Sequence, residues 1–279
     1  MSKTDSDSKL TELALHPTLV GCFRFIENVL GYQLSEKDKE PFIFYHHFLT
    51  NPEPAFSIEW RSDPKRMKWR DKFSNVMLGD VQNALACVLY HHGRLCGLEK
   101  LLHAGLDSID FSKLFDENMG SGGGNSLTFD FEYQAYVLAF RRCLDYLARA
   151  IGAYFIQDYQ SFNSLAKKLK KINRPAVTDR IIEVHEKYCP HFEFVLSTGD
   201  RKSVRDNISH RGYVPFGVVN INRQGVFIAS DMIDPIAFYG REYPLLSVLL
   251  NQQIDNLRNC LHDTVHAYVD GIKQEEGAV

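Results

Sequence analysis

Apolar residues recur every three or four positions over most of the chain, which is the spacing of one face of an α-helix. The longest such segments run from Phe129 to about Tyr159 and from Tyr243 to about Ile272. The apolar stripe of the second segment consists of Leu246, Leu249, Leu250, Ile254, Leu257, Leu261, Val265 and Tyr268. Shorter segments with the same period predict helices over 10–30, 41–49, 73–106, 161–174 and 178–188. The pattern therefore predicts a mainly α-helical protein.

The period changes after Gly212. Two short runs rich in Val, Ile and Phe, 216–222 and 225–230, flank the turn sequence Asn-Arg-Gln-Gly. Such runs around a glycine-containing turn are typical of a β-hairpin. We expect a small β-hairpin inserted before the last helix.

Breaks in the pattern divide the chain into four parts. Residues 1–9 are polar and predict a disordered tail. Residues 116–126, DENMGSGGGNS, hold three consecutive glycines and predict a loop or linker. A phosphate-binding P-loop is excluded there because no Gly-Lys-Ser/Thr follows. The linker separates a helical N-terminal region of unknown role, 10–115, from a helical domain over 127–273.

Composition narrows the class of protein. The 279 residues carry a formal net charge of −3, which argues against a broadly basic nucleic-acid-binding protein but not against a local basic patch. No apolar run is long enough to span a membrane, and the polar N-terminus resembles no secretory signal. The six cysteines form no CxxC pair, so we interpret them as reduced thiols of a cytoplasmic protein. His91, His92 and His103 have poor spacing for one ion, so no metal site and no cofactor are predicted.

The candidate site is the segment Ser197–Gly212, which reads STGDRKSVRDNISHRG. Ser197 or Thr198 is predicted to cap a helix, and Gly212 to end it. The segment thus combines a helix start, charged and titratable side chains, and a helix stop within 16 residues.

Two side chains of this segment can act on a phosphate, and a third can position one of them. Arg205 offers a two-pronged hydrogen-bond donor for phosphate oxygens. Asp206 and His210 are four positions apart, so the carboxylate would orient the imidazole and raise its pKa. His210 could then transfer protons near neutral pH. The structural alternative is a salt bridge for Arg205 and a helix C-cap role for His210.

The sequence Arg-Asp-Asn-Ile-Ser-His over 205–210 resembles the signature of the HEPN family, an Arg and a His separated by four to six residues with a polar residue after the Arg. The stretch RRCLDYLARAI over 141–151 looks like the opening helix of HEPN domains and precedes the Arg–His helix, as in that family. A second match, RIIEVH over 180–185, has Ile after the Arg, and we interpret it as structural. RNCLH over 258–262 falls one residue short of the family spacing.

The resemblance implies an HEPN-type helical bundle over 127–273 that dimerises with its Arg–His helices face to face. It implies a metal-independent endoribonuclease that cleaves RNA by attack of the 2′-hydroxyl. His210 would be the proton-transfer group, Arg205 the phosphate binder and Asp206 the polar residue beside it. Such proteins are common in toxin–antitoxin and phage-defence systems, so RNA and an antitoxin or regulatory protein are the expected partners of the homodimer. Two alternatives are a non-catalytic HEPN module that binds RNA, nucleotide or protein, and a helical scaffold.

Two further groups of charges accompany this site. The strongest local positive charge is formed by Lys167, Lys168, Lys170, Lys171 and Arg174. It could steer an RNA backbone to the site, and a solvated lysine face is the alternative. On the helix over 129–159, Asp145 and Arg149 have the spacing of an ion pair.

Overall fold

The computed structural model describes residues 17–51, 62–117, 119–197, 203–211, 217–229 and 234–275, so the predicted tail over 1–9 lies outside the described residues. The chain divides into two compact units, 1–37 and 38–279. Within the first unit, helix α2 (Pro17–Leu30) has large apolar side chains that are exposed, among them Phe25, Val29 and Leu30. The second unit holds the remaining elements, apart from the first two residues of α3 (Glu36–Thr50).

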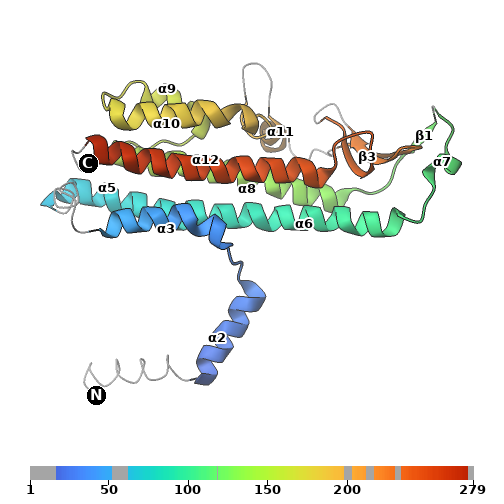
Figure 1. Cartoon of the computed structure of the whole chain (residues 1–279), viewed down its shortest axis with the longest axis horizontal. Coiled ribbons are helices and arrows are strands. Elements are labelled where there is room, and N and C mark those ends of the chain that lie inside the picture. Colours follow the sequence, from blue (N-terminus) through green and yellow to red (C-terminus); the bar gives the residue numbers. More distant parts are fainter. Residues whose placement is uncertain are drawn as a thin grey trace. The chain divides into compact units, whose positions relative to one another are not determined.

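Long helices form the body of the second unit (Figure 1). They are α5 (Pro64–Asn75), the π-helical turn η1 (Val76–Val81), α6 (Gln82–Leu106), α8 (Leu127–Tyr154), α10 (Pro175–Tyr188) and α12 (Leu246–Glu275). The helix α6 packs against α8, and α10 packs against α12. The prediction of a mainly helical fold is therefore confirmed, and no helix in the described part of the chain is long and apolar enough to cross a membrane.

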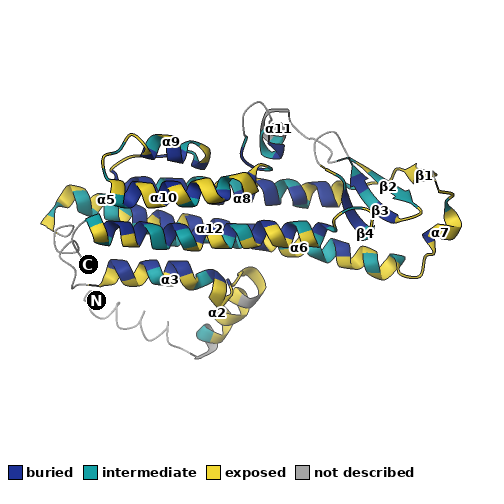
Figure 2. Ribbon diagram, turned by 45° about the horizontal axis from the view of Figure 1, so that its top comes forward, coloured by how far each residue is buried: buried dark blue, intermediate teal, exposed yellow. Residues whose placement is uncertain are grey.

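The apolar stripes seen in the sequence line the interior of this bundle. Tyr136, Phe140 and Leu144 of α8 are fully buried, as are Leu257 and Leu261 of α12. Figure 2 shows buried residues recurring along each of these helices, alternating with intermediate and exposed ones. Burial of large apolar side chains on both long helices supplies the main driving force for the fold.

The contact between α10 and α12 is close enough to require a glycine. A Cβ atom at Gly271 would lie 2.7 Å from the carbonyl oxygen of Ala176 and 2.7 Å from the Cα of Val177. Since real side chains do not approach backbone atoms this closely, any larger residue would push the two helices apart.

The predicted hairpin forms, and it belongs to a larger sheet. Strands β2 (Val218–Asn222) and β3 (Gly225–Ala229) pair around the expected turn. The strands β1 (Gly120–Gly122) and β4 (Ile236–Gly240) complete an antiparallel sheet with the order β1-β2-β3-β4. Gly225 and Gly240 pair in this sheet at φ angles of +145° and +107°. A Cβ at Gly225 would lie 2.1 Å from the carbonyl oxygen of Tyr239, and a Cβ at Gly240 would lie 2.1 Å from that of Gln224 in the turn before β3. Only glycine fits both positions.

The glycine-rich segment 116–126, predicted as a loop or linker, lies inside the second unit. Its residues Gly120–Gly122 form the edge strand β1, in which Ser121 pairs with Ile221 of β2. The helices on its two sides, α6 and α8, pack directly against one another. The second unit therefore runs without a break from 38 to 279, and the expected boundary between 10–115 and 127–273 lies inside it.

Short helices connect the long ones. The predicted helix over 161–174 is divided into η2 (Phe162–Ser164) and α9 (Leu165–Leu169), and α10 begins at Pro175. The other short helices are α7 (Phe111–Leu114), η3 (Cys189–Phe192) and α11 (Val204–Arg211). The last of these carries the Arg–His sequence.

Candidate functional site

The helix α11 begins later than the sequence predicts. The helix begins at Val204. Residues 198–202 and 212–216, and with them Thr198 and Gly212, lie outside the described residues. The hydroxyl oxygen of Ser203 accepts a hydrogen bond from the backbone N–H of Asp206 at 3.2 Å. Ser203 is therefore the capping residue instead of Ser197 or Thr198. Its N–H group in turn donates to the hydroxyl of Ser197 at 3.2 Å.

Arg205 and Asp206 form an ion pair at the start of α11. The Arg205 Nη1 donates to Asp206 Oδ1 at 2.8 Å, and the hydroxyl of Ser197 donates to Asp206 Oδ2. Burial alone would raise the pKa of the Asp206 carboxyl, but the bonds from Ser197 and Arg205 outweigh it and hold that pKa below its ordinary value. Asp206 is therefore ionised at neutral pH and fixes one edge of the guanidinium.

The rest of the Arg205 guanidinium is only partly satisfied within the described residues. Its side chain is 31% exposed, and its buried Nε finds no hydrogen-bond acceptor among the described residues. A buried N–H group without an acceptor is unfavourable, so an oxygen that reached it would gain a hydrogen bond, although the atom is covered from solvent in this structure. The salt bridge named above as the structural alternative thus exists, and it occupies only part of the guanidinium.

Arg141 of α8 adds positive charge beside this turn and lowers the pKa of Asp206. Its guanidinium donates from Nε to Asp145 Oδ2 at 2.8 Å, from Nη1 to the carbonyl of Val195 at 3.2 Å, and from Nη2 to the hydroxyl of Ser161 at 2.9 Å. With three bonds to the protein, Arg141 anchors the connection before α11 to the long helix α8. Its positive charge adds to the electrostatic potential of the site, but all three of its side-chain nitrogens already donate to the protein.

The ion pair predicted on α8 is corrected by these contacts. Asp145 pairs with Arg141 and not with Arg149, because its other oxygen accepts the backbone N–H of Phe162 at 2.9 Å and so turns the carboxylate away. Arg149 donates instead to Gln160 Oε1 at 3.2 Å.

His210 lies in the last turn of α11, five residues after Arg205. Its side chain lies outside the described part of the structure, and so does its predicted contact with Asp206. Five residues of an α-helix rise by about 7.5 Å, a distance that one phosphodiester group with its flanking sugars can span. The backbone of α11 thus carries the two predicted residues at opposite ends of a two-turn helix.

The predicted RNA-binding cations do not form one free patch. Lys170 forms an ion pair with Glu186 at 2.9 Å. Arg174 donates to the hydroxyl of Tyr154 at 3.2 Å and also lies over the ring of that tyrosine.

The other three lysines of this run form no ion pair with a described residue. Lys168 lies over the ring of Tyr159, with its Nζ 5.3 Å from the ring centre. Lys167 and Lys171 are exposed. In both views of the molecule, α9 lies toward the end of the bundle that carries the C-terminus, whereas α11 lies farther along toward the sheet (Figures 1 and 2). The run therefore flanks the Arg205 turn at a distance along the bundle and does not line it.

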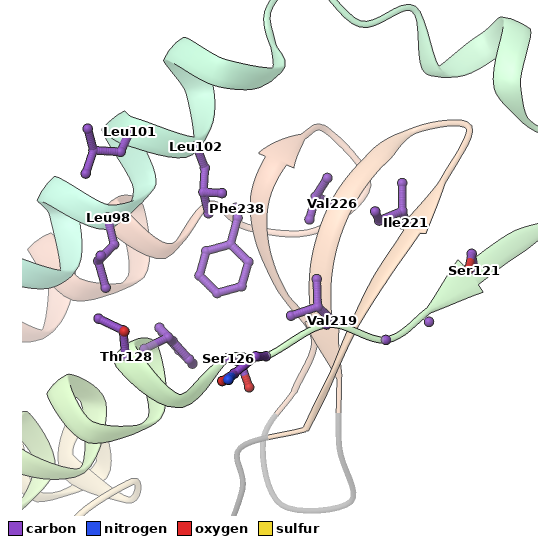
Figure 3. Close-up of a pocket in the computed structure, with 15 residues that line it drawn as sticks. Leu98, Leu101, Leu102, Ser121, Ser126, Thr128, Val219, Ile221, Val226 and Phe238 are labelled. Atoms are coloured by element: carbon purple, nitrogen blue, oxygen red, sulfur yellow. The ribbon is translucent and has the colours of Figure 1, made fainter.

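A cavity of about 630 Å³ lies between α6, the start of α8 and the sheet. Its walls are mainly apolar, with Leu98 and Leu102 from α6 facing Val219 and Phe238 from the sheet (Figure 3). Residues 122–126 of the glycine-rich segment form its polar rim. No sequence signal predicted this cavity, because its walls come from segments far apart in the chain.

The histidines whose spacing is poor for one metal ion have separate partners. The Nδ1 of His91 lies 2.8 Å from Glu132 Oε2, and the Nε2 of His92 lies 2.9 Å from Asn251 Oδ1. His103 lies on the same helix, with its Nε2 3.8 Å from a carboxylate oxygen of Glu99.

A different group of side chains could hold a metal ion. It consists of Glu40 on α3 and His262 and His266 on α12. The spacing of the two histidines, HDTVH, is visible in the sequence and places both on one helix face. Their partner Glu40 lies more than 200 residues away, so no spacing could have found it.

Comparison with known proteins identifies no relative: no family model matches the chain, and no curated protein and no solved structure matches it. The HEPN resemblance therefore depends on the residues of 141–151 and 205–210 and on the order of the helices that carry them.

Proposed function

We propose that the protein is a metal-independent endoribonuclease of HEPN type that acts as a homodimer. The observation that carries the proposal is the helix α11, which has Arg205 in its first turn and His210 in its last and packs against α8 of the bundle. The partly free guanidinium of Arg205 supports it, because phosphate oxygens are the acceptors that such a group binds best.

Cleavage of RNA through its own 2′-hydroxyl needs a base, an acid and a cation. In the proposed reaction, His210 of one protomer removes the 2′-hydroxyl proton, and the 2′-oxygen attacks the adjacent phosphorus. The bond from phosphorus to the 5′-oxygen breaks, and that oxygen takes a proton from the second copy of His210. Arg205 stabilises the negative charge that develops on the phosphorane oxygens. The products are a 2′,3′-cyclic phosphate and a 5′-hydroxyl.

Asp206 has a different role in this proposal. It holds the Nη1 of Arg205 at 2.8 Å and is itself held by Ser197, so it positions the guanidinium without touching RNA.

A toxin or defence effector of this kind needs an antitoxin or regulatory protein to restrain it in the producing cell.

The test compares two motif variants with a matched control. Arg205→Ala and His210→Ala are each expected to lower RNA cleavage at least about 100-fold, because each removes one of the groups the reaction needs. Arg180→Ala, in the second Arg–His match, removes an exposed arginine that bonds Gln274 and should leave cleavage unchanged. Cleavage should survive EDTA and leave a cyclic phosphate, with all variants dimeric by light scattering. Undiminished cleavage in either motif variant contradicts the proposal.

A second candidate function is a non-catalytic HEPN module that binds RNA or a nucleotide. It is favoured by the ion pair itself, since Arg205 Nη1 and both oxygens of Asp206 are already engaged within the chain. This candidate predicts that the wild-type protein binds RNA in a filter assay without producing cleaved ends. Loss of that binding in Arg205→Ala would distinguish it from a scaffold in which the Arg–His sequence is accidental.

A further inference from the structure

Three side chains from two helices converge at the contact between α3 and α12. The Nε2 of His262 lies 3.7 Å from one carboxylate oxygen of Glu40, and the Nε2 of His266 lies 3.5 Å from the other. The two imidazoles are one helical turn apart, with ring centres separated by 4.3 Å. One ligand atom from each of the three residues lies within 4.8 Å of the others.

These separations are close to those of a zinc site. Two ligand atoms that bind one tetrahedral Zn²⁺ at 2.0–2.1 Å are about 3.3 Å apart. The two nitrogen–oxygen distances, one to each carboxylate oxygen of Glu40, exceed this value by a few tenths of an ångström. With one ligand atom per residue the separations stay within 4.8 Å, so side-chain rotations must bring the three atoms closer around an ion. Two imidazole nitrogens and one carboxylate oxygen are also the donor types that zinc prefers, whereas Mg²⁺ and Ca²⁺ require mostly oxygen ligands.

One ring nitrogen of this group lacks a hydrogen bond. The Nε2 of His266 is buried and finds no hydrogen-bond partner among the described residues, although it faces Glu40. A buried polar atom without a partner costs free energy, and most buried polar atoms in proteins have one. A metal ion between His266 and Glu40 would satisfy this nitrogen.

The surroundings hold both rings in orientation. The Nδ1 of His262 lies 3.2 Å from Asp263 Oδ1, and a carboxylate behind a metal-binding imidazole is the usual second partner of such a ligand. Asp263 is fixed in turn by Lys187 at 2.9 Å and by the hydroxyl of Tyr188 at 2.7 Å. His266 stacks on the ring of Phe44, with ring centres 3.9 Å apart.

The group is open to an incoming ion. The side chains of His262 and Glu40 are about half exposed, at 50% and 46%. An ion can therefore enter from solvent, and a water molecule can take the fourth position that three protein ligands leave.

We propose that Glu40, His262 and His266 form a zinc-binding site that fastens α3 to α12. The same two helices are already joined by Asp38 and Arg258, which bond at 2.6 Å and 3.2 Å one turn earlier on α12. A bound Zn²⁺ adds a second link between them. This site is separate from the residues assigned to RNA cleavage, so either proposal can fail without the other.

The test measures Zn²⁺ binding to the full-length protein by competition with a chromogenic chelator. The expected result is one Zn²⁺ per chain, with Mg²⁺ and Ca²⁺ unable to compete. His262→Gln and His266→Gln should each weaken binding by about 100-fold or more, since each removes one of three ligands. His47→Gln is the matched control, because it removes an exposed histidine of α3 outside the group and should bind as wild type.

Two further measurements keep the proposal testable if a variant folds poorly. A Zn²⁺ concentration a hundredfold above the dissociation constant should raise the melting temperature of the wild type by roughly 5 °C. Co²⁺ bound to the wild type should show the strong visible bands of a four-coordinate ion, and Glu40→Gln, with a folded circular dichroism spectrum, should lose them. If the wild type binds no Zn²⁺, or if His262→Gln and Glu40→Gln bind it as tightly as His47→Gln, the site does not exist.

Discussion

The start of α11 and the contact between α3 and α12 both gather charged side chains at a helix surface, but they are built in opposite ways. At α11, the ion pair joins Arg205 to Asp206, its neighbour in sequence. At the α3–α12 contact, Arg258 reaches Asp38 over 220 residues, and His262 and His266 face Glu40 from the same side of α12.

The difference shows what each group of charges stabilises. The pair at α11 holds one side chain in place within a single helix end and adds little to the tertiary fold. The pairs at the α3–α12 contact connect two helices, and Asp38 is only 4% exposed there. Charges that are buried between elements should therefore matter more for stability, and the local pair more for the chemistry of Arg205.

The largest expected effect is on the α3–α12 contact. Arg258→Met should lower the free energy of unfolding by about 3 kcal/mol, because it deprives the buried Asp38 carboxylate of its cation. Burial disfavours the charged guanidinium, but the bonds to Asp38 outweigh it and raise the pKa of Arg258. Urea denaturation measures the loss.

The control for that experiment is an exposed ion pair of similar chemistry. Arg223 lies 3.5 Å from Glu117, with both side chains exposed at 44% and 85%. Arg223→Met should therefore cost less than about 0.5 kcal/mol. Equal losses in the two arginine variants would show that the contact between α3 and α12 is not the stronger of the two. The double variant of Asp38→Asn and Arg258→Met should recover part of the loss, since it removes both charges together.

The same contrast explains what the sequence could predict. Helical periodicity located α8, α10 and α12 to within a few residues, because buried stripes impose their spacing on the sequence itself. Periodicity could not show that β1 exists, since Gly120–Gly122 has one small polar side chain between two glycines and is fixed by pairing with β2. The cavity, and the contact of His262 with Glu40, could not be predicted from periodicity either, because each is formed by segments that are distant in sequence.

Local sequence was also insufficient at the candidate site. Arg205 and His210 identify the segment, but several polar residues there can cap a helix, and the sequence favours Ser197 or Thr198. The structure selects Ser203, and it uses Ser197 to bridge Ser203 and Asp206. Which of several equivalent hydroxyls faces the helix end is decided by the path of the chain, and spacing does not encode that path.

A smaller effect is expected at α11. Asp206→Asn should lower the free energy of unfolding by about 1 kcal/mol at neutral pH, because the amide keeps the bond from Ser197 but loses the ion pair with Arg205. The pKa of the Asp206 carboxyl is lower in the folded protein than its ordinary value of about 3.9. Its contribution is therefore fully present above the pKa of the unfolded chain and is lost as the pH falls through the folded pKa.

Urea denaturation of the wild type and Asp206→Asn between pH 7 and pH 3 checks this sign. The difference between the two proteins should be constant at neutral pH and shrink on the acid side. Asp71→Asn, at an exposed aspartate that lies 3.6 Å from Arg70, serves as control for a surface pair. A difference that grows as the pH falls contradicts the assignment of a stabilising ionised Asp206.

The smallest effects on stability are expected on the lysine run, where they separate RNA contact from structure. Lys167 and Lys171 are exposed and form no ion pair within the described residues, whereas Lys170 is engaged by Glu186. Replacing any of the three by Ala should change the free energy of unfolding by less than about 0.5 kcal/mol. If the protein binds RNA through this run, Lys167→Ala and Lys171→Ala should each reduce the slope of log K against log salt concentration by about 0.7, and Lys170→Ala should reduce it less. Equal slopes in all three variants and the wild type would assign the lysines to a solvated surface and leave Arg205 as the phosphate contact to test.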